Sequence, residues 1–413
     1  MGNLAFTRTS VALVLLLALL AIAACSSTDP ETAPAGPAPS PPPPSTTAPT
    51  PTPPGTTTTT PPGPAVTSVR VHYASSASGA ALPGAISLRG SAAPLSWTAS
   101  AATVSDQPGL YTWSAKDLKT AIELKPMLGE TWSRGPNYKV EPGKTVDIYP
   151  RFVESRGAVT KRYPAFVSQK LPSTRGIWVY LPPTYLENTE ARLGVLYMHD
   201  GANLFDPVLA FGGNEWKVDE TMDAGAEDGS IREAIVVGIG GTAARIAELT
   251  PTADPQNGGG RADDYLAMLT DEIKPLIDKE LRTVPAREQT AIMGSSLGGL
   301  VSAYAGVHHA DVFGLVGEMS PSTWWDGTVI LGVVSSTKTQ PARPLRVYVD
   351  SGDSGVSNDD VVNTTELAAR YRSVGYKDKQ DLLHVVQAGA QHNEIYWSQR
   401  LPAALAFLLG PRP

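Results

Sequence analysis

Cysteine is almost absent from this sequence, because Cys25 is the single cysteine among 413 residues. A disulfide framework and a cysteine-based metal site are therefore excluded. Positive charge is not in excess: 33 lysines and arginines stand against 40 aspartates and glutamates, which gives a net charge of −7. This balance predicts no nucleic-acid partner. Histidine is also scarce, and its six copies leave few candidates for a catalytic base.

Long hydrophobic runs are absent apart from one near the N-terminus. Residues 11–24 are mostly apolar and follow Arg8. This run is too short to span a bilayer comfortably, and its basic start and small-residue end are typical of a secretory signal peptide. The end of the run, Ile22-Ala23-Ala24-Cys25, resembles a lipobox, in which the cysteine is lipidated and becomes the mature N-terminus. An ordinary signal peptide with an incidental cysteine is the alternative.

From these features we predict a signal peptide over residues 1–24 and lipidation of Cys25. The protein is then exported and anchored to the membrane of a bacterial cell envelope, on its extracytoplasmic side. Residues 26–64 consist almost entirely of Pro, Thr, Ala, Ser and Gly. Such a composition cannot bury an apolar core, so we predict a disordered linker between the anchor and the folded domains.

Residues 65–153 have the short, alternating segments of an all-β domain. The segments 69–73 and 145–149 alternate apolar and polar residues as half-buried strands do, and turn residues separate further short strands between them. We therefore predict a small β-sandwich of immunoglobulin-like or carbohydrate-binding-module type. Four segments resemble the framework of a starch-binding module: 88–90, 94–97, 111–113 and 132–137.

Two tryptophans of this domain, Trp97 and Trp132, have two interpretations. In a carbohydrate-binding module they would stack on sugar rings. In a domain this small, a tryptophan more often packs in the core, and we expect packing.

Residues 160–413 alternate between apolar strands and amphipathic helices, which predicts an α/β domain with a mostly parallel sheet. One helix is expected over about 262–281, because its leucines and isoleucines recur every three or four residues. The expected strands are 176–181, 193–198, 234–239, 290–293, 315–319, 345–349 and 384–386, and a helix over 401–409 closes the chain.

A short glycine-rich motif follows the strand at 290–293. Gly294-Ser295-Ser296-Leu297-Gly298 fits G-x-S-x-G, the nucleophile elbow in which a serine projects from a tight turn between a strand and a helix. The pattern alone also arises by chance in a chain of this length. It gains weight only if a base, an acid and an oxyanion hole occur in suitable places.

Four separated motifs resemble the putative-esterase (esterase D) family of α/β-hydrolases, over roughly residues 165–410. That family includes feruloyl, acetyl-xylan and siderophore esterases, S-formylglutathione hydrolases and mycolyltransferases. The resemblance implies an α/β-hydrolase fold and an ester or thioester substrate. The motifs are Tyr-Met-His-Asp-Gly-Ala-Asn-Leu-Phe-Asp (197–206), Gly-Ser-Ser-Leu-Gly-Gly (294–299), Met-Ser-Pro-Ser-Thr-Trp-Trp (319–325) and Gly-Ala-Gln-His-Asn-Glu-Ile-Tyr-Trp (389–397).

A serine nucleophile needs an adjacent base, which in this fold comes after the serine and the acid in chain order. His384 and His392 are the two histidines that lie beyond the late strands. His384 stands within an apolar strand segment, where a packing role is expected. His392 lies in a Gly/Ala/Gln/Asn loop before the last helix, where the family has its final histidine. We predict His392 as the base for Ser296.

The acid is expected in the loop after the strand at 345–349, where four aspartates compete. Asp359 keeps the expected distance to the next helix and is our choice, with Asp353 as the alternative acid. Asp350 and Asp360 are predicted to be turn or cap residues.

Two backbone N–H groups are expected to form the oxyanion hole. One belongs to Leu297, directly after the nucleophile. The resemblance implies that the other belongs to Ala202, in the turn after an early strand. His199 and Asp200 are expected to shape that turn. Trp324 and Trp325 either line an acyl pocket or pack structurally.

Neither a cofactor nor a metal is expected. His308, His309 and Asp311 occur at the end of a helix without a matching ligand set, so helix-end histidines are the interpretation.

The leading prediction is a carboxylic-ester hydrolase that acts through a Ser-His-Asp triad on a small-molecule or polysaccharide-linked ester. One alternative is an acyltransferase of the mycolyltransferase type. The other is a non-catalytic surface protein that binds carbohydrate through the sandwich.

Overall fold

A computed structural model describes residues 65–76, 84–337 and 343–410. The predicted signal peptide, the lipidation site Cys25 and the whole linker lie outside these residues. Among the described residues, no helix is both long and apolar enough to cross a bilayer.

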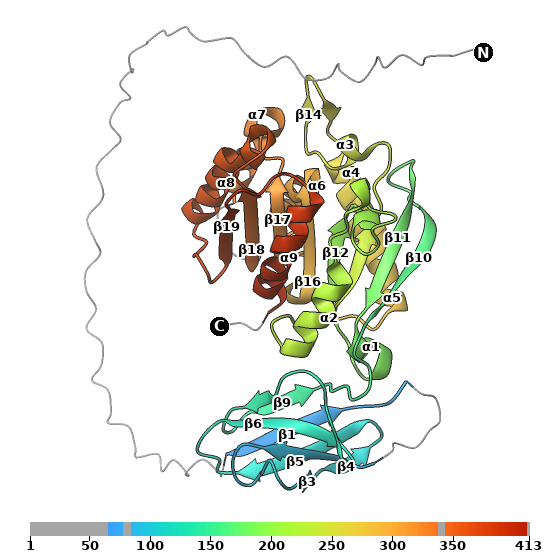
Figure 1. Cartoon of the computed structure of the whole chain (residues 1–413), viewed down its shortest axis with the longest axis vertical. Helices are drawn as coiled ribbons and strands as arrows, with labels where there is room; N and C mark the ends of the chain where they lie inside the picture. Colours follow the sequence, from blue (N-terminus) through green and yellow to red (C-terminus); the bar gives the residue numbers. More distant parts are fainter. Residues whose placement is uncertain (1–64, 77–83, 338–342, 411–413) are drawn as a thin grey trace, which may run out of the picture. The chain divides into compact units, whose positions relative to one another are not determined.

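The first part of the described chain builds two small, mostly antiparallel sheets (Figure 1). One has the strand order β4-β5-β1-β9; the other has the order β3-β2-β6-β7, with β8 paired to β6. Alternate residues such as Val69, Val71 and Leu88 are fully buried and form a shared core, as the alternating pattern predicted. The strands are β1 (Val66–His72), β2 (Ile86–Gly90), β3 (Ala101–Ala102), β4 (Val104–Gln107), β5 (Leu110–Lys116), β6 (Ile122–Leu128), β7 (Thr131–Trp132), β8 (Tyr138–Val140) and β9 (Thr145–Ile148).

Trp97 and Trp132 do not belong to that core. Their exposed fractions are 37% and 39%, and their ring centroids lie 6.1 Å apart. The guanidinium of Arg89 lies 5.1 Å from the ring centroid of Trp132. The expectation that both tryptophans pack in the interior is therefore wrong; Trp113 packs there instead.

The rest of the chain forms an eight-stranded sheet with the order β10-β11-β13-β12-β16-β17-β18-β19. β10 and β11 pair antiparallel with their neighbours, and all strands from β13 to β19 pair parallel. The α/β fold with a mostly parallel sheet is thus as predicted. The strands are β10 (Ala158–Val167), β11 (Thr174–Leu181), β12 (Gly194–His199), β13 (Ala234–Ile239), β16 (Thr290–Ser296), β17 (Leu315–Pro321), β18 (Arg346–Gly352) and β19 (Leu382–Gln387); a separate hairpin comprises β14 (Ala253–Asp254) and β15 (Gly258–Gly259).

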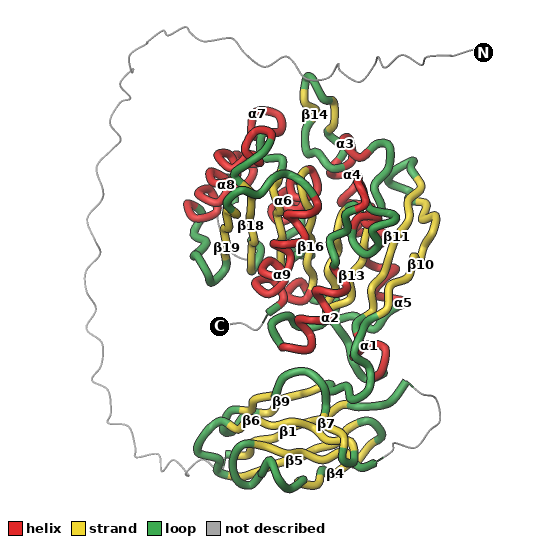
Figure 2. The backbone as a smooth tube through the Cα atoms, in the orientation of Figure 1, coloured by secondary structure: helices red, strands yellow, loops and turns green. Residues whose placement is uncertain are grey.

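Helices cover both faces of this sheet (Figure 2). Successive strand residues point to opposite faces, so Tyr197 joins one hydrophobic cluster while Leu196 and Met198 join the other. The first cluster packs against α4, α5, α6, α7 and α8, and the second against α2 and α9. The helices are α1 (Pro183–Glu187), α2 (Val218–Asp228), α3 (Arg245–Glu248), α4 (Ala262–Ala267), α5 (Lys274–Glu280), α6 (Leu297–His308), α7 (Trp325–Ser335), α8 (Val361–Ser373) and α9 (Glu394–Leu409).

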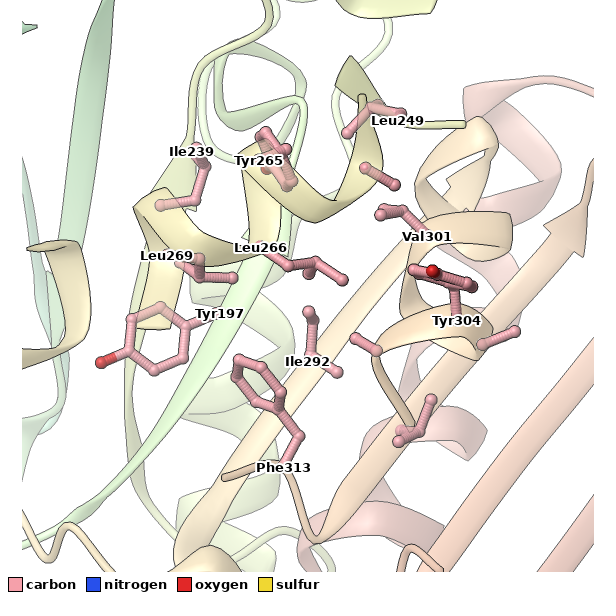
Figure 3. Packing of buried hydrophobic residues seen from close by; sticks show 14 of the residues in the cluster. Tyr197, Ile239, Leu249, Tyr265, Leu266, Leu269, Ile292, Val301, Tyr304 and Phe313 are labelled. Carbon is pink, nitrogen blue, oxygen red and sulfur yellow. The ribbon is translucent and has the colours of Figure 1, made fainter. Parts of the chain in front are cut away.

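The helix predicted over 262–281 is present but not uniform. A π-helical segment, Met268–Ile273, joins α4 to α5. Pro275, the second residue of α5, has no backbone N–H to donate, which explains why the regular pattern of helical hydrogen bonds changes here. Its apolar residues still face the sheet: Leu266 and Leu269 pack toward Ile292 and Phe313 (Figure 3).

Candidate active site

Ser296 stands at the junction of β16 and α6. Its φ of 57° and ψ of −123° are unusual for a residue with a side chain, as expected of a strained nucleophile turn. Gly294 permits the tight approach: a Cβ there would lie 2.8 Å from Cδ2 of His199 and 3.0 Å from the carbonyl carbon of Gly298. The strand-turn-helix context that the motif requires is thus present.

His199 lies beneath this turn and is buried. Its Nδ1 is 2.7 Å from the hydroxyl of Tyr265, and its Nε2 is 3.2 Å from Oγ of Ser302. Burial lowers the pKa of His199 to about 4, so the ring is neutral at physiological pH. His199 therefore supports the base of the elbow, and it is not among the residues that line the active-site cavity.

Asp359 and His392 are brought together by the fold. His392 Nδ1 lies 2.5 Å from Oδ1 of Asp359, whose side chain is completely buried. The second oxygen of Asp359 accepts hydrogen bonds from Ser320 Oγ at 2.7 Å and from the backbone N–H of Gly352. Burial raises the pKa of Asp359, but these hydrogen bonds outweigh it and hold the pKa below its usual value.

The other three aspartates of this region have different partners. Asp353 accepts from the backbone N–H of Gly389 at 2.6 Å, away from His392. Asp360 precedes α8 as its N-cap residue and accepts from the backbone N–H of Trp324 at 3.1 Å. Asp350 is not a turn or cap residue as expected: it is a fully buried residue of β18 that pairs with Arg400. The buried guanidinium of Arg400 stabilises the carboxylate of Asp350, which explains why this aspartate lies inside a strand and not in a turn.

His392 and Ser296 face a common cavity. Because Nδ1 of His392 is held by Asp359, Nε2 is the ring nitrogen available to a substrate or to Ser296. Among the described residues, the hydroxyl of Ser296 is hydrogen-bonded to Ser322 Oγ at 3.3 Å rather than to His392. A nucleophile and base often close to hydrogen-bond distance only when substrate binds. His384 lies half-buried on β19 and does not line this cavity.

The two predicted oxyanion donors belong to segments near Ser296, because Leu297 follows it directly and Ala202 lines the same cavity. Leu297 is the first residue of α6, so its amide belongs to the turn whose N–H groups lack acceptors within the helix. Ala202 lies in a short 3-10 turn, Gly201–Asn203, and lines the cavity. Asp200 precedes this turn with a φ of 55°, and Arg245 holds its carboxylate through two hydrogen bonds of 2.7 Å.

The cavity has a volume of about 540 Å³, large enough for a substrate with one or two rings. Charge within it is largely paired, because Arg245 neutralises Asp200. Burial raises the pKa of Glu394, which stands at the start of α9. The lining residues are Asp200, Ala202, Asn203, Phe211, Gly241, Arg245, Ser295, Ser296, His392, Asn393, Glu394 and Trp397.

Neither Trp324 nor Trp325 lines the active-site cavity, so the acyl-pocket role considered for them is wrong and only Trp325 has the packing role. Trp325 is buried, and its indole N–H donates to the backbone oxygen of Thr252 at 3.1 Å. Trp324 is 46% exposed and does not line the cavity.

Several residues around Asp359 were not singled out in the sequence. Ser320 Oγ donates to Asp359 and accepts from Trp397 Nε1 at 3.0 Å and from Arg400 Nη2 at 2.8 Å. Arg400 also lies 2.9 Å from Asp350 and 3.9 Å from Asp359. One signal was available: Trp397 and Arg400 are three residues apart on the helix that follows His392, so they share a face.

One group of potential metal-ligating side chains exists among the residues that the structure describes. Glu215, Asp219 and Glu220 offer carboxylate oxygens within 4.8 Å of one another. Burial raises the pKa of Asp219 to about 7. His308, His309 and Asp311 form no such group in the described part of the chain.

Comparisons with known proteins give one family match and several similar chains. The profile of the family described as Putative esterase matches residues 168–408. YbbA, an uncharacterized protein of Bacillus subtilis strain 168, is 24% identical over 256 residues, which cover 59% of this chain and 96% of YbbA. The enterobactin esterase of Shigella flexneri is 15% identical with a TM-score of 0.47, over 79% of this chain and 88% of that one. A feruloyl esterase module of Clostridium thermocellum is 17% identical with a TM-score of 0.47, over 62% of this chain and 89% of that one.

Proposed function

The chain belongs to the Putative esterase family of serine hydrolases, and from that premise we propose that Ser296, His392 and Asp359 hydrolyse carboxylic esters. The observation that carries this assignment is the 2.5 Å contact between His392 Nδ1 and Asp359 Oδ1, beside a cavity that Ser296 and His392 both line. A carboxylate at Nδ1 holds the imidazole in the tautomer whose Nε2 accepts a proton. Asp353, the alternative acid, has no such contact.

The reaction follows from these positions. Ser296 Oγ attacks the acyl carbon and gives its proton to Nε2 of His392. The carbonyl oxygen becomes an oxyanion, which the N–H groups of Ala202 and Leu297 stabilise. The intermediate then expels the alcohol, which takes the proton from His392, and Ser296 is left acylated. Water gives a proton to His392 and attacks the acyl carbon; the carboxylic acid leaves, and Ser296 regains its proton.

A Ser296→Ala variant tests the assignment with p-nitrophenyl acetate as substrate. We expect kcat to fall by at least about 10⁴-fold, because no other group replaces the attacking oxygen. Ser322→Ala is the control, since its hydroxyl lies 3.3 Å from Ser296 Oγ; a loss of less than about tenfold is expected. Retained activity in Ser296→Ala would refute the proposal.

We propose further that the N-terminal sheets bind carbohydrate. The support is the exposed pair Trp97 and Trp132, since aromatic rings open to solvent offer faces on which a sugar ring can stack. Co-sedimentation with insoluble polysaccharides tests this: Trp97→Ala and Trp132→Ala should each reduce binding. Such binding would also favour acyl transfer to a sugar acceptor, which product analysis with and without sugar acceptors would distinguish from hydrolysis.

Export and membrane attachment through Cys25 complete the proposal. The support is the short apolar run that ends in Ile-Ala-Ala-Cys. Labelling of cells with a fatty-acid analogue should mark the wild-type chain and not Cys25→Ser. Equal labelling of both would contradict the anchor.

A further inference from the structure

One carboxylate in the active-site cavity has no role in the proposed reaction. Glu394, the first residue of α9, lines this cavity together with Ser296 and His392. Among the described residues, Glu394 forms no ion pair with a lysine or an arginine. The side-chain amide of Asn203 donates to its carboxylate at 3.5 Å, which is long for a hydrogen bond. The carboxylate is therefore available to a ligand.

Glu394 is also the negative charge that the cavity wall leaves uncompensated. The other carboxylate of the wall belongs to Asp200, which accepts two hydrogen bonds of 2.7 Å from Arg245, so the charges of that pair cancel. Burial raises the pKa of Glu394, and the charge of Asp200 adds to this effect. The ionised form of Glu394 would thus gain from a cation beside it, and a positively charged ligand supplies one.

Aromatic rings flank this carboxylate. Trp397 lies three residues after Glu394 in α9, so the two side chains share a face of the helix, and both line the cavity. Asn203 connects Glu394 to Phe211: its side-chain oxygen accepts from the backbone N–H of Phe211 at 3.0 Å, while its amide donates to Glu394. Phe211 lines the cavity too and is 76% exposed. The faces of aromatic rings attract cations, as a carboxylate does.

The alcohol part of a bound ester lies beside these groups. It must come within hydrogen-bond distance of His392, from which it takes its proton as it leaves. Glu394 is two residues from His392 in the chain, and the ring centroids of Trp397 and His392 are 5.1 Å apart. A charged group on the alcohol, a few bonds from the ester oxygen, is therefore placed next to Trp397 and Glu394.

We propose that Glu394, Trp397 and Phe211 form a subsite for an alkylammonium group on the alcohol part of the ester that Ser296 attacks. The proposal rests on the esterase function and adds the charge of the substrate. Glu394 supplies the opposite charge, and the two aromatic rings contact the alkyl groups around the nitrogen. The same carboxylate repels an ester whose alcohol is negatively charged.

Two acetyl esters with alcohols of the same shape test the subsite. Acetylcholine carries a trimethylammonium group, and 3,3-dimethylbutyl acetate has a neutral carbon in place of that nitrogen. The value of kcat/KM for each ester is measured in a pH-stat at mildly alkaline pH, and the ratio of the acetylcholine value to the neutral-ester value is compared between proteins. The different intrinsic reactivities of the two esters then cancel.

In Glu394→Gln this ratio should fall about tenfold, because the side chain keeps its shape and loses its charge in a half-buried position. Glu394→Asp keeps the charge, so it should retain a larger ratio than Glu394→Gln. In Phe211→Leu, an apolar side chain remains without a ring face, and the ratio should fall about threefold. Phe211 is mostly exposed, so this change leaves the core intact.

A matched control and a second reading identify the source of the effect. Glu288→Gln removes an exposed glutamate just before β16, at the opposite end of the strand from Ser296, and should leave the ratio at its wild-type value. An unchanged ratio in Glu394→Gln would overturn the subsite, whatever the other variants show. Hydrolysis of 3,3-dimethylbutyl acetate by Ser296→Ala would instead overturn the esterase mechanism, so the two failures are distinguishable.

Discussion

At the scale of single residues, Asp359 is notable because both of its carboxylate oxygens have partners. Oδ1 contacts His392, while Oδ2 accepts from Ser320 and from the backbone of Gly352. These bonds outweigh burial, which alone would raise its pKa, and keep the pKa low. Asp359 is thus charged at neutral pH, which is what the orientation of a catalytic imidazole requires.

Replacing Asp359 by asparagine should lower kcat for p-nitrophenyl acetate by about 10³- to 10⁴-fold, because the amide no longer favours the tautomer with a free Nε2. Asp353→Asn is the matched control, since Asp353 contacts the backbone of Gly389 instead, and it should keep most of the activity. If Asp353→Asn lost more activity than Asp359→Asn, the acid would be misassigned.

Glu318 gives the fold a pH dependence of its own. Burial raises the pKa of this carboxyl group on β17 from 4.5 to about 8, although the hydroxyl of Tyr371 contacts it. Between these values the folded state holds a proton that the unfolded state has released, so stability falls as pH rises through that window. In Glu318→Gln the thermal midpoint should decline less between about pH 5 and about pH 8 than in the wild type. If plots of the thermal midpoint against pH ran parallel for the two proteins, they would contradict this role of Glu318.

At the scale of elements, hydrophobic pattern predicted the strands of the sheet well, because most are buried on both faces. β10 and α2 were not predicted, for physical reasons. β10 is an edge strand with mostly exposed side chains, so its sequence has no apolar period. α2 contains a glycine and several acidic residues, and its buried side chains are few. Tertiary packing, rather than local sequence, determines both elements.

The turn of Ala202 depends on a close approach between backbones. A Cβ at Gly201 would lie 2.6 Å from the carbonyl carbon of Gly238 on β13, so the turn would have to move. Gly201→Ala should therefore lower kcat for p-nitrophenyl acetate by about 10- to 100-fold through misplacement of one oxyanion donor. Gly332→Ala, in α7, is the control because nothing lies within 4 Å of its added Cβ. Equal kcat values for the two variants would show that the turn is not critical.

Arg400 links α9 to β18. Its guanidinium lies 2.9 Å from Asp350, and both side chains are buried. Arg400→Met should lower the free energy of unfolding by about 3–5 kcal/mol, because Asp350 is left as an unpaired buried charge. The double variant Arg400→Met/Asp350→Asn should recover part of that loss in chemical denaturation. A double variant less stable than Arg400→Met would contradict a pairing role.

At the scale of the whole molecule, the site exists because parallel strands end at one edge of the sheet. Asp200 follows β12, Ser296 is the last residue of β16, and the loop that carries Asp359 follows β18; these three strands all point the same way. Chain order predicted the serine and the histidine. It did not decide among four aspartates, because that choice depends on the path of the loop Val356–Asp360 in three dimensions. The buried group of Asp350, Ser320 and Arg400 was missed for the same reason.

The central claim is that Ser296 is the nucleophile, and covalent trapping tests it most directly. The folded chain is treated with a fluorophosphonate, and the modified peptide is identified by mass spectrometry. One phosphonyl group should be found on Ser296, no labelling should occur in Ser296→Ala, and labelling should be slow in His392→Ala because the base is missing. Labelling of Ser322 instead, or an unlabelled wild-type chain, would contradict the account.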